Sequence, residues 1–461
     1  MNADHRSTVK ERARLGKSLR KKAPRSSHAQ WTPGPGRPDP ISLLEEQNKD
    51  RLDWLVPVRH GRMMASPFAF FRGGARIMAA DLSVTPVTGL NVQACGDAHL
   101  ANFGLYASPE RELVFDVNDF DETLEGPWEW DIKRLAASFA IAARHNGLGR
   151  KDSNQATGQV VRSYREAMNE FAEWRTMDIW YAVSDEKQFR GFAHSVGQKK
   201  QAARLAEKTT RKDSLQALDK LAEEINGEYR IKSQPPLLVP LSDLTERLDY
   251  ASEETLIRGA FEEYAKTLLP ERKVLLDRFH PVDMALKVVG VGSVGTRCWI
   301  LLLEGRDRGD PLFLQMKEAT YSVLAEHLGP SPYENHGRRV VEGQRLMQTV
   351  SDIFLGWTRH PEEGRDYYWR QLRDWKGSVN IDDLDDEGLC GYAQACGWTL
   401  ARAHARSGDP ISIAAYLGSS DTFDRALIKF ADLYVDQNQR DYEAFLEEIR
   451  SGRLDADPEA T

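Results

Sequence analysis

The sequence predicts a mixed α+β fold with a large helical lobe and a small antiparallel β lobe. Most of the chain carries apolar residues at helical spacing, and the highly charged region from 150 to 280 is mostly helical by the same criterion. From residue 283 the pattern changes to apolar runs of strand length, rich in Val, Ile and Leu and separated by turn residues. A chain of 461 residues with 41% hydrophobic content can form one large domain or two of medium size.

The predicted helical lobe covers residues 41–280. The stretch "WTPGPGRPDP" interrupts any helix or central strand, so the folded body is expected to begin there, after a flexible basic arm at 1–40. The elements expected in this lobe are helices at 41–55 and 67–82, short strands in "GLNVQAC" and "RELVFDV", a helix over "PWEWDIKRLAASFAIAARHNG" that ends at its glycine, and extended structure in the proline-rich "KSQPPLLVPL".

The predicted β lobe covers residues 281–380. It begins with a β-meander and also contains a helix at 334–351 and an aromatic strand candidate, "YYWRQLRDW". The C-terminal segment, 381–461, is expected to return to the helical lobe. Its helices are predicted at 385–406 and over "DTFDRALIKFADLYVDQNQRDYEAFLEEI".

The charge distribution argues against a nucleic-acid-binding role for the whole molecule. The net charge is −8 although the first 40 residues are strongly basic, so the remaining body is acidic. The basic stretch "KERARLGKSLRKKAPR" could contact a phosphate-rich or acidic surface. A solvated tail that folds back on the acidic body is the favoured interpretation, because charge runs at termini usually indicate disorder.

The sequence also predicts a cytoplasmic protein. No apolar run approaches the roughly 18 residues of a membrane-spanning helix, and the N-terminus lacks the apolar core of a secretory signal. The four cysteines have no CxxC spacing, which argues against a zinc site or a disulfide framework.

Three glycines stand between two predicted strands. "GVGSVG" supplies Gly290, Gly292 and Gly295, but a dinucleotide-binding fingerprint would continue into a helix, whereas "TRCWILLLEG" is a strand candidate. Strand, glycine loop and strand is the geometry of the flap that covers ATP phosphates in protein kinases, where backbone N–H groups approach the phosphates. For the glycines alone, a flexible hairpin turn is an equal alternative.

Lys317 favours the phosphate-binding interpretation. It lies in "LFLQMKEA", on the next predicted strand, and a lysine in a buried strand needs a partner. In kinases such a lysine binds the α- and β-phosphates and is positioned by a glutamate from the following helix. Glu342 is the first choice for that glutamate, with Glu326 and Glu334 as rivals. The alternative is an edge-strand lysine that points to water.

The stretches "QACGDAHLANFG" and "LVFDVNDFDET" carry the candidate catalytic and metal-binding groups. Asp97 and Asn102 have the D-x-x-x-x-N offset of the kinase catalytic loop, and Asp119 stands where a metal-binding aspartate would follow. Two carboxylates roughly 4 Å apart at an effective dielectric near 20 repel by about 4 kcal/mol, so they need a compensating cation. Mg²⁺ fits this role. The alternative is a set of caps and turn formers on a surface loop.

Five neighbouring residues have secondary interpretations. Asp116 and Asp121 are second choices for the metal, and His99 is expected to brace the loop. Asp131, at the head of a predicted helix, is expected to hold the loop by accepting hydrogen bonds from backbone N–H groups. Arg72, in "FFRGG", has two interpretations. It is a contact for phosphate or for an acidic substrate, or it makes a structural ion pair.

"GDAHLANF" followed by "VNDFDE" resembles the GDxHxxN…DFxD signature of aminoglycoside and choline kinase-type phosphotransferases, a branch of the protein-kinase-like superfamily. From "HGRMMASPFAFFRGGA" through "FADLYVDQNQRDY" the chain is also similar to a bacterial family called domain of unknown function 2252, which has no settled substrate. The resemblance implies a two-lobed kinase-like fold and an ATP- and Mg²⁺-dependent phosphotransferase whose acceptor is a small molecule or a protein. The implied roles are catalytic base for Asp97, metal binding for Asn102 and Asp119, and nucleotide binding for Gly290, Gly292, Gly295 and Lys317, with Glu342 setting the lysine.

The motifs stand in reversed order, because the catalytic loop precedes the glycine loop. The sequence therefore predicts a circular permutation, which requires the helix before the catalytic loop to lie near the C-terminus. "GYAQACGWTLARAHARSGDP" fits, because it resembles the "LARLHA" helix of those phosphotransferases. Asp409 is rejected as a catalytic aspartate in normal order, because Ala414, five positions later, cannot hold a metal.

Two other functions remain open on the sequence. Transfer of AMP to a protein on the same scaffold would require ATP to bind in the opposite direction. A non-catalytic nucleotide-binding regulator is the other, although the complete set of Lys317, Asp97, Asn102 and Asp119 argues against it.

Overall fold

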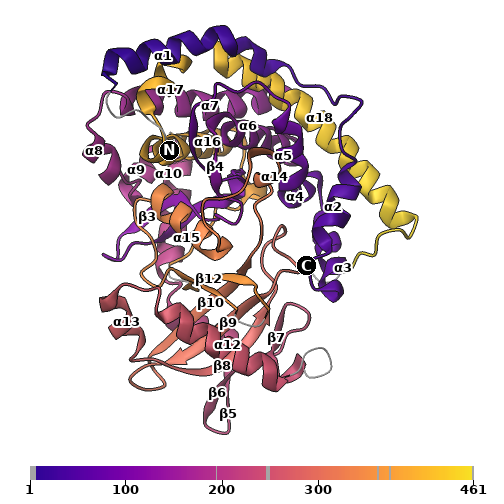
Figure 1. The fold of residues 1–461 in the computed structure, drawn as a ribbon, viewed down its shortest axis with the longest axis vertical. Helices are drawn as coiled ribbons and strands as arrows, with labels where there is room; N and C mark the ends of the chain where they lie inside the picture. Colours follow the sequence, from indigo (N-terminus) through magenta and orange to yellow (C-terminus); the bar gives the residue numbers. More distant parts are fainter. Residues whose placement is uncertain (1–6, 194, 245–249, 361–362, 373–374, 459–461) are drawn as a thin grey trace.

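A computed structural model describes residues 7–193, 195–244, 250–360, 363–372 and 375–458. The fold is mixed α+β. Most of the helices gather at one end of the molecule, and a six-stranded antiparallel sheet lies at the other with α12 (Tyr250–Ala265) and α13 (Pro270–Leu276) beside it (Figure 1). No helix within the described ranges is long and apolar enough to cross a membrane.

Four long helices form the centre of the helical part. They are α6 (Trp128–His145), α7 (Arg150–Phe171), α16 (Asp386–Ser407) and α18 (Thr422–Arg450), and they pack against one another. The contact between α16 and α7 is close because α16 has a glycine there. A Cβ atom on Gly397 would lie 2.4 Å from the carbonyl oxygen of Val160. The three helices predicted over these segments of α6, α16 and α18 are confirmed.

Shorter helices surround this core. Those before and beside the first motif loop are α1 (Val9–Lys22), α2 (Pro40–Asn48), α3 (Val56–Met64), α4 (Pro67–Gly73) and α5 (Ala75–Ser83). The others are α8 (Thr176–Tyr181), α9 (Glu186–Gly191), α10 (Val196–Thr210), α11 (Ser214–Leu221), α12 (Tyr250–Ala265), α13 (Pro270–Leu276), α14 (Ala325–Leu328), α15 (His336–Met347) and α17 (Pro410–Leu417). The single helix expected at 67–82 is divided between α4 and α5, because Gly74 ends the first of them.

The six-stranded sheet has the order β11-β12-β10-β9-β8-β7, with every pair antiparallel. Its strands are β7 (Leu238–Pro240), β8 (His280–Lys287), β9 (Cys298–Glu304), β10 (Pro311–Ala319), β11 (Gly356–Arg359) and β12 (Asp366–Gln371). The predicted meander is confirmed in β8, β9 and β10, and the aromatic strand in β12. Lys317 lies on β10, opposite Cys298 on one side and Tyr368 on the other.

One face of this sheet is covered by α12 and α13. Ile257, Ala260 and Tyr264 of α12 share a buried core with Leu301 and Leu314 of the sheet. These two helices therefore pack with the β part, whereas the sequence assigns their residues to the helical lobe that ends at 280. The reason is that both helices present apolar faces that the sheet buries.

Three two-stranded sheets complete the fold. They pair β1 (Asn91–Ala94) with β4 (Leu124–Pro127), β2 (Phe103–Ala107) with β3 (Leu113–Val117), and β5 (Ala222–Ile225) with β6 (Glu228–Ile231). The strands predicted in "GLNVQAC" and "RELVFDV" are confirmed as β1 and β3. The pairs β1–β4 and β2–β3 flank the two acidic loops. Each of these loops therefore begins and ends at a paired strand, which fixes its position.

The basic N-terminal segment is a helix that lies along α17 (Figure 1). Thr8 caps α1 in a capping box with Glu11, and Arg12 pairs with Asp409, the N-cap residue of α17. Arg20 donates hydrogen bonds to the carbonyls of residues 415 and 416 in α17. Cations near the C-terminus of a helix are favourable, so the arm folds back as a docked helix where charge alone predicts a flexible tail.

We expect a side chain at Gly16 to separate α1 from α17. A Cβ atom at Gly16 would lie 2.1 Å from the carbonyl oxygen of Ser412, so Gly16→Leu should weaken this contact by about 1–3 kcal/mol. Hydrogen exchange should then accelerate in residues 9–22 and stay unchanged in α6. Gly36→Leu is the control, because nothing lies within 4 Å of its Cβ position. Unchanged exchange in Gly16→Leu would contradict the observed contact.

Candidate functional site

A cleft of about 260 Å³ brings the two predicted motif regions together. It is lined by Asp97, Asn102 and Asp119 from the acidic loops and by Gly290 and Gly292 from the loop between β8 and β9. These positions are far apart in the sequence and meet where the helical part faces the sheet.

The first acidic loop is held by Asp131, at the start of α6. Its carboxylate accepts hydrogen bonds from the backbone N–H groups of Cys95 (2.6 Å) and Gly96 (2.9 Å). Gly96 has a φ of 80°, and a Cβ there would lie 2.4 Å from the carbonyl oxygen of Glu122. The predicted role of Asp131 is therefore confirmed, and glycine is required beside it.

A buried chain of polar groups supports Asp131 from behind. His404 of α16 places Nε2 3.1 Å from the Asp131 carboxylate, and the Tyr164 hydroxyl lies 2.8 Å from Nδ1 of the same histidine. All three side chains are buried. His404 lies in the "LARAHA" stretch of α16, so this C-terminal helix supports the loop that the sequence places near the start of the fold.

Asp97 is held by an arginine and has a shifted pKa. Arg134 Nε donates to Asp97 Oδ1 at 2.6 Å. Burial raises the pKa of Asp97 to about 6, and the positive charge of Arg134 opposes this effect. His99 Nε2 lies 3.7 Å from Asp97 Oδ2, but burial lowers the pKa of His99 well below its ordinary value. His99 is therefore neutral, and its backbone N–H donates to the Asp97 carbonyl within the loop.

Asn102 and Asp119 present oxygen atoms that suit Mg²⁺. Asn102 Nδ2 donates to the backbone carbonyl of Asp97 at 2.8 Å, which leaves the side-chain oxygen available to bind a cation. The Asp119 carboxylate accepts the N–H of Asp121 at 3.1 Å and has no ion-pair partner among the described residues. Cys95 Sγ lies 3.3 Å from the Asp119 carbonyl, so the two loops are tied together.

This donor set fits a cation that is shared with a ligand. The described part of the chain contains no group of three or more His, Cys, Asp or Glu side chains arranged to hold a metal. Mg²⁺ commonly takes one or two carboxylates and completes its coordination with water and phosphate oxygens. Asp119 and Asn102 therefore fit Mg²⁺ bound together with a phosphate better than a cage made only by protein.

The predicted lysine is paired with an acid of the second loop. Lys317 is 2% exposed and forms an ion pair with Asp121. Tyr368 Oη donates to Asp121 Oδ1 at 2.8 Å, and Ser293 Oγ lies 3.1 Å from Oδ2. Burial opposes ionisation of both charged groups, but their attraction dominates, so the pKa of Lys317 is raised and the pKa of Asp121 is lowered. Asp121 is thus the partner of Lys317, whereas the sequence suggested Asp121 only as a second choice for metal binding.

The predicted pairing of Lys317 with Glu342 is wrong. Glu342 lies beside Arg345 (3.8 Å) and Arg338 (4.0 Å), on the same helix. The rival Glu326 pairs with Arg76 at 2.9 Å, and Glu334 also forms no ion pair with the lysine. The reason is the register of α15, which brings an arginine to the acidic loop in place of a glutamate.

That arginine is Arg339. It donates hydrogen bonds to the backbone carbonyls of Thr123 (2.6 Å), Asp121 (2.8 Å) and Thr320 (2.9 Å). Helix α15, which follows the strand of Lys317, therefore holds the second acidic loop through the backbone carbonyls of that loop. Sequence reasoning missed Arg339 because its partners are backbone carbonyls. Every residue has one, so such contacts leave no pattern in the sequence.

The glycine loop is also held through its carbonyls. It runs between antiparallel strands, as predicted. Arg51 donates to the carbonyl of Gly292 at 2.8 Å, Arg62 donates to that of Gly290 at 2.6 Å, and the N–H of Leu52 donates to that of Gly295 at 2.8 Å. Gly295 lies against Arg51 and does not line the cleft. These contacts hold the glycine loop against the helical part. The two arginines that make them belong to no recognisable sequence motif.

Two other sequence candidates lie in different surroundings. Asp116 forms a buried ion pair with Arg402 of α16 and does not line the cleft, so it is a structural residue. Arg72 does line the cleft, and its guanidinium has no ion pair with any residue that the structure describes.

A family model described as "Uncharacterized protein conserved in bacteria (DUF2252)" matches residues 51–448. The chain belongs to this family. No curated protein and no solved structure matches the chain. The DUF2252 match includes both acidic loops, the glycine loop and Lys317, and it excludes α1 and α2.

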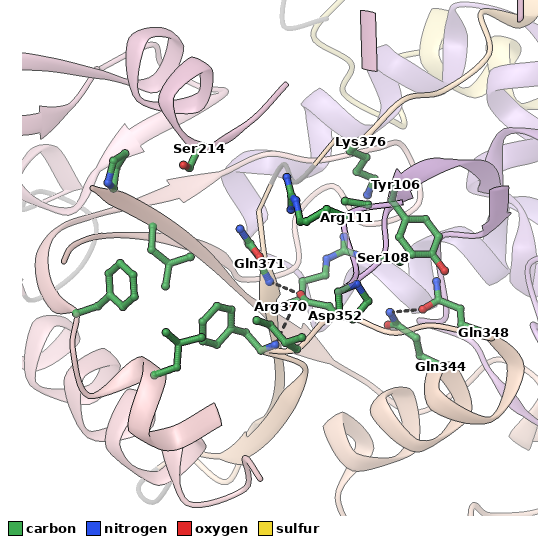
Figure 2. Close-up of a pocket in the computed structure, with 18 of the residues that line it drawn as sticks. Tyr106, Ser108, Arg111, Ser214, Gln344, Gln348, Asp352, Arg370, Gln371 and Lys376 are labelled. Atoms are coloured by element: carbon green, nitrogen blue, oxygen red, sulfur yellow. Dashed lines mark hydrogen bonds between the residues drawn. The ribbon is translucent and has the colours of Figure 1, made fainter. Parts of the chain in front are cut away.

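The DUF2252 chain has a second pocket, of about 360 Å³, whose lining Figure 2 shows in close-up. It is lined by Tyr106 of the β2–β3 hairpin, Gln344 of α15, Gln348 directly after that helix, and Arg370 of β12, among others. None of the predicted site residues lines it. The two pockets approach each other at Asn118 and Asp119, because these consecutive residues line one pocket each.

We expect Asp131→Ala to destabilise the DUF2252 fold. It removes the acceptor of two buried backbone N–H groups and the partner of His404, so the free energy of unfolding should fall by about 3 kcal/mol in urea titrations. Asp277→Ala, at an exposed position, is the control and should change it by less than about 0.5 kcal/mol. Equal stabilities would contradict the anchoring role of Asp131.

Proposed function

We propose that this DUF2252 protein is an ATP- and Mg²⁺-dependent phosphotransferase with a two-lobed, circularly permuted kinase-like fold. The observation that carries the proposal is the single cleft shared by Asp97, Asn102, Asp119 and the glycine loop, with Lys317 behind it. In this proposal the sheet with its helices is the nucleotide-binding lobe, and the acceptor is a small molecule or a protein.

A contact between α16 and β1 supports the permutation. The N–H of Gln93, in β1, donates to Ser407 Oγ at the end of α16 at 3.0 Å. A Cβ on Gly408 would lie 3.1 Å from the carbonyl oxygen of Asn91. In kinase order a helix leads into the catalytic loop, and α16 ends where that loop's strand begins. Permutation is tolerated where the rejoined ends lie close together.

The proposed reaction transfers the γ-phosphoryl group of ATP to an acceptor hydroxyl. The acceptor oxygen forms a bond to the γ-phosphorus, the bond from that phosphorus to the β–γ bridging oxygen breaks, and ADP leaves. Asp97 takes the proton of the acceptor hydroxyl. Its pKa of about 6 is suited to a general base that works near neutral pH, and Arg134 fixes its orientation.

The other residues bind and position the nucleotide. Amides of the glycine loop and the ammonium of Lys317 would bind phosphate oxygens, while Asp121 holds the ammonium in place. Asn102 and Asp119 would hold Mg²⁺, which neutralises phosphate charge when bound. Catalysis then consists of positioning and charge stabilisation, with no covalent intermediate on the protein.

The proposal predicts ATP turnover that depends on the cleft. We expect purified protein with ATP and MgCl₂ to form ADP, and Asp97→Asn, Asp119→Asn and Lys317→Met to lower the rate by about 10²–10⁴-fold, as loss of an acid–base or charge-stabilising group does. Glu342→Gln is the control, because this glutamate has no contact with Lys317, and its rate should stay within about twofold.

Mass spectrometry of the products separates the alternatives. ADP and a product heavier by one phosphoryl group support phosphotransfer, whereas pyrophosphate and an AMP-modified product would establish nucleotidyl transfer. Bound nucleotide without turnover would establish a regulator. A parental rate in Asp97→Asn would remove Asp97 as the base.

The rate should depend on ionisation of Asp97. We expect kcat/KM to fall with a midpoint near pH 6 as the pH decreases, because the protonated carboxyl cannot accept the acceptor proton. Arg134→Gln should move this midpoint to higher pH, because Arg134 lowers the pKa of Asp97. Circular dichroism at each pH controls for unfolding, and a profile that stays flat through pH 6 would contradict the assignment.

A further inference from the structure

Arg72 differs from the other arginines around the cleft. Arg51 and Arg62 bind carbonyls of the glycine loop, Arg76 pairs with Glu326, and Arg134 pairs with Asp97. The guanidinium of Arg72 forms no hydrogen bond or ion pair with any residue that the structure describes, and its Nε is buried without a partner. A charged group in this state is costly unless a ligand compensates it.

The position of Arg72 lies between the two halves of the cleft. Arg72 belongs to the last turn of α4, and its carbonyl oxygen lies 3.5 Å from the Cβ position of Gly292 in the glycine loop. On the other side, Arg134 donates to the carbonyl of Phe71 at 3.1 Å while it binds Asp97. The backbone beside Arg72 is therefore tied to the loop that carries Asp97.

Nearby carboxylates offset part of the cost of burying the Arg72 guanidinium. Burial lowers the pKa of Arg72, and the nearby carboxylates of Asp97 and Asp119 oppose this effect. Neither carboxylate is within ion-pair distance of it. An arginine that lies near carboxylates but pairs with none of the described ones is suited to a ligand with a tetrahedral oxyanion, because its N–H groups form a fork that matches two oxygens.

We propose that Arg72 is a catalytic residue that binds the phosphoryl group during its transfer, between Gly292 and Asp97. This inference rests on the proposed phosphotransfer. When the bond to the acceptor oxygen forms and the bond to ADP breaks, negative charge is spread over the equatorial oxygens of the phosphoryl group. Arg72 would donate hydrogen bonds to two of them, while Asp97 takes the acceptor proton. The guanidinium keeps its proton throughout.

The test compares binding of a ground-state and a transition-state ligand by isothermal titration calorimetry. The probes are MgADP alone and MgADP with aluminium fluoride, which mimics the phosphoryl group in transfer. We expect the parent to bind the second more tightly, and Arg72→Ala to keep MgADP affinity but lose most of that gain. Its kcat should fall by about 10³-fold with KM for ATP within a few-fold, as for a transition-state arginine.

Two further variants separate a catalytic from a structural role. Arg76→Ala, four residues further along the chain in α5, removes a guanidinium already paired with Glu326 and should keep the fluoride-dependent gain. Arg72→Lys retains the charge without the fork and should restore part of the gain. It also serves as the test if Arg72→Ala does not fold, as judged by its melting temperature.

Each outcome has one meaning. If the parent does not bind MgADP, the proposed function itself fails. If the parent binds both ligands and Arg72→Ala keeps the full fluoride-dependent gain, phosphotransfer survives and the role of Arg72 is overturned. The role of Arg72 would also be overturned if Arg72→Ala and Arg72→Lys lowered the affinities for MgADP and for MgADP with aluminium fluoride equally. The arginine would then act on nucleotide binding and not on the transferred group.

Discussion

The buried ion pair between Lys317 and Asp121 is the interaction on which the cleft depends. Each charge alone would be costly to bury, and each is stabilised because the other stands opposite it. Lys317 comes from the sheet and Asp121 from a loop of the helical part, so neither part can satisfy its own charge. The pair therefore fixes the distance between the two walls, and Tyr368 and Ser293 hold Asp121 from the same side as the lysine.

Arginines that bind backbone carbonyls fix the remaining loops. Arg51 and Arg62 hold the glycine loop, Arg339 holds the acidic loop, and Arg134 joins the end of α4 to Asp97. A guanidinium can bind several carbonyls at once because it has five donors in a fixed plane. These contacts within the protein pre-organise the loops, which lowers the ordering cost that ligand binding would otherwise carry.

Most of the elements could be predicted from the sequence, whereas the partners of the motif residues could not. The glycine loop between strands, the strand of Lys317 and the anchoring role of Asp131 follow from local pattern and spacing. The partner of Lys317 is Asp121 and not Glu342, because the register of α15 directs Arg339 to the loop and no periodicity argument fixes that register. The arginine contacts are to backbone atoms, which every residue shares. Charge predicted an arm that folds back on the acidic body, but not a helix docked on α17, because docking depends on the carbonyls at the end of that helix.

The C-terminal helix α16 supports the first acidic loop by hydrogen bonds. Its end contacts the start of β1 through Gln93 and Ser407, and His404 of the same helix supports Asp131, which in turn holds Cys95 and Gly96. Side-chain hydrogen bonds thus join this C-terminal helix to a loop that lies about 300 residues earlier in the chain, as the separation of 314 residues between Gln93 and Ser407 shows. Such a join costs more ordering entropy than a short peptide link. The buried polar chain from Tyr164 through His404 to Asp131 compensates for that cost, because each member satisfies a group that would otherwise be buried without a partner.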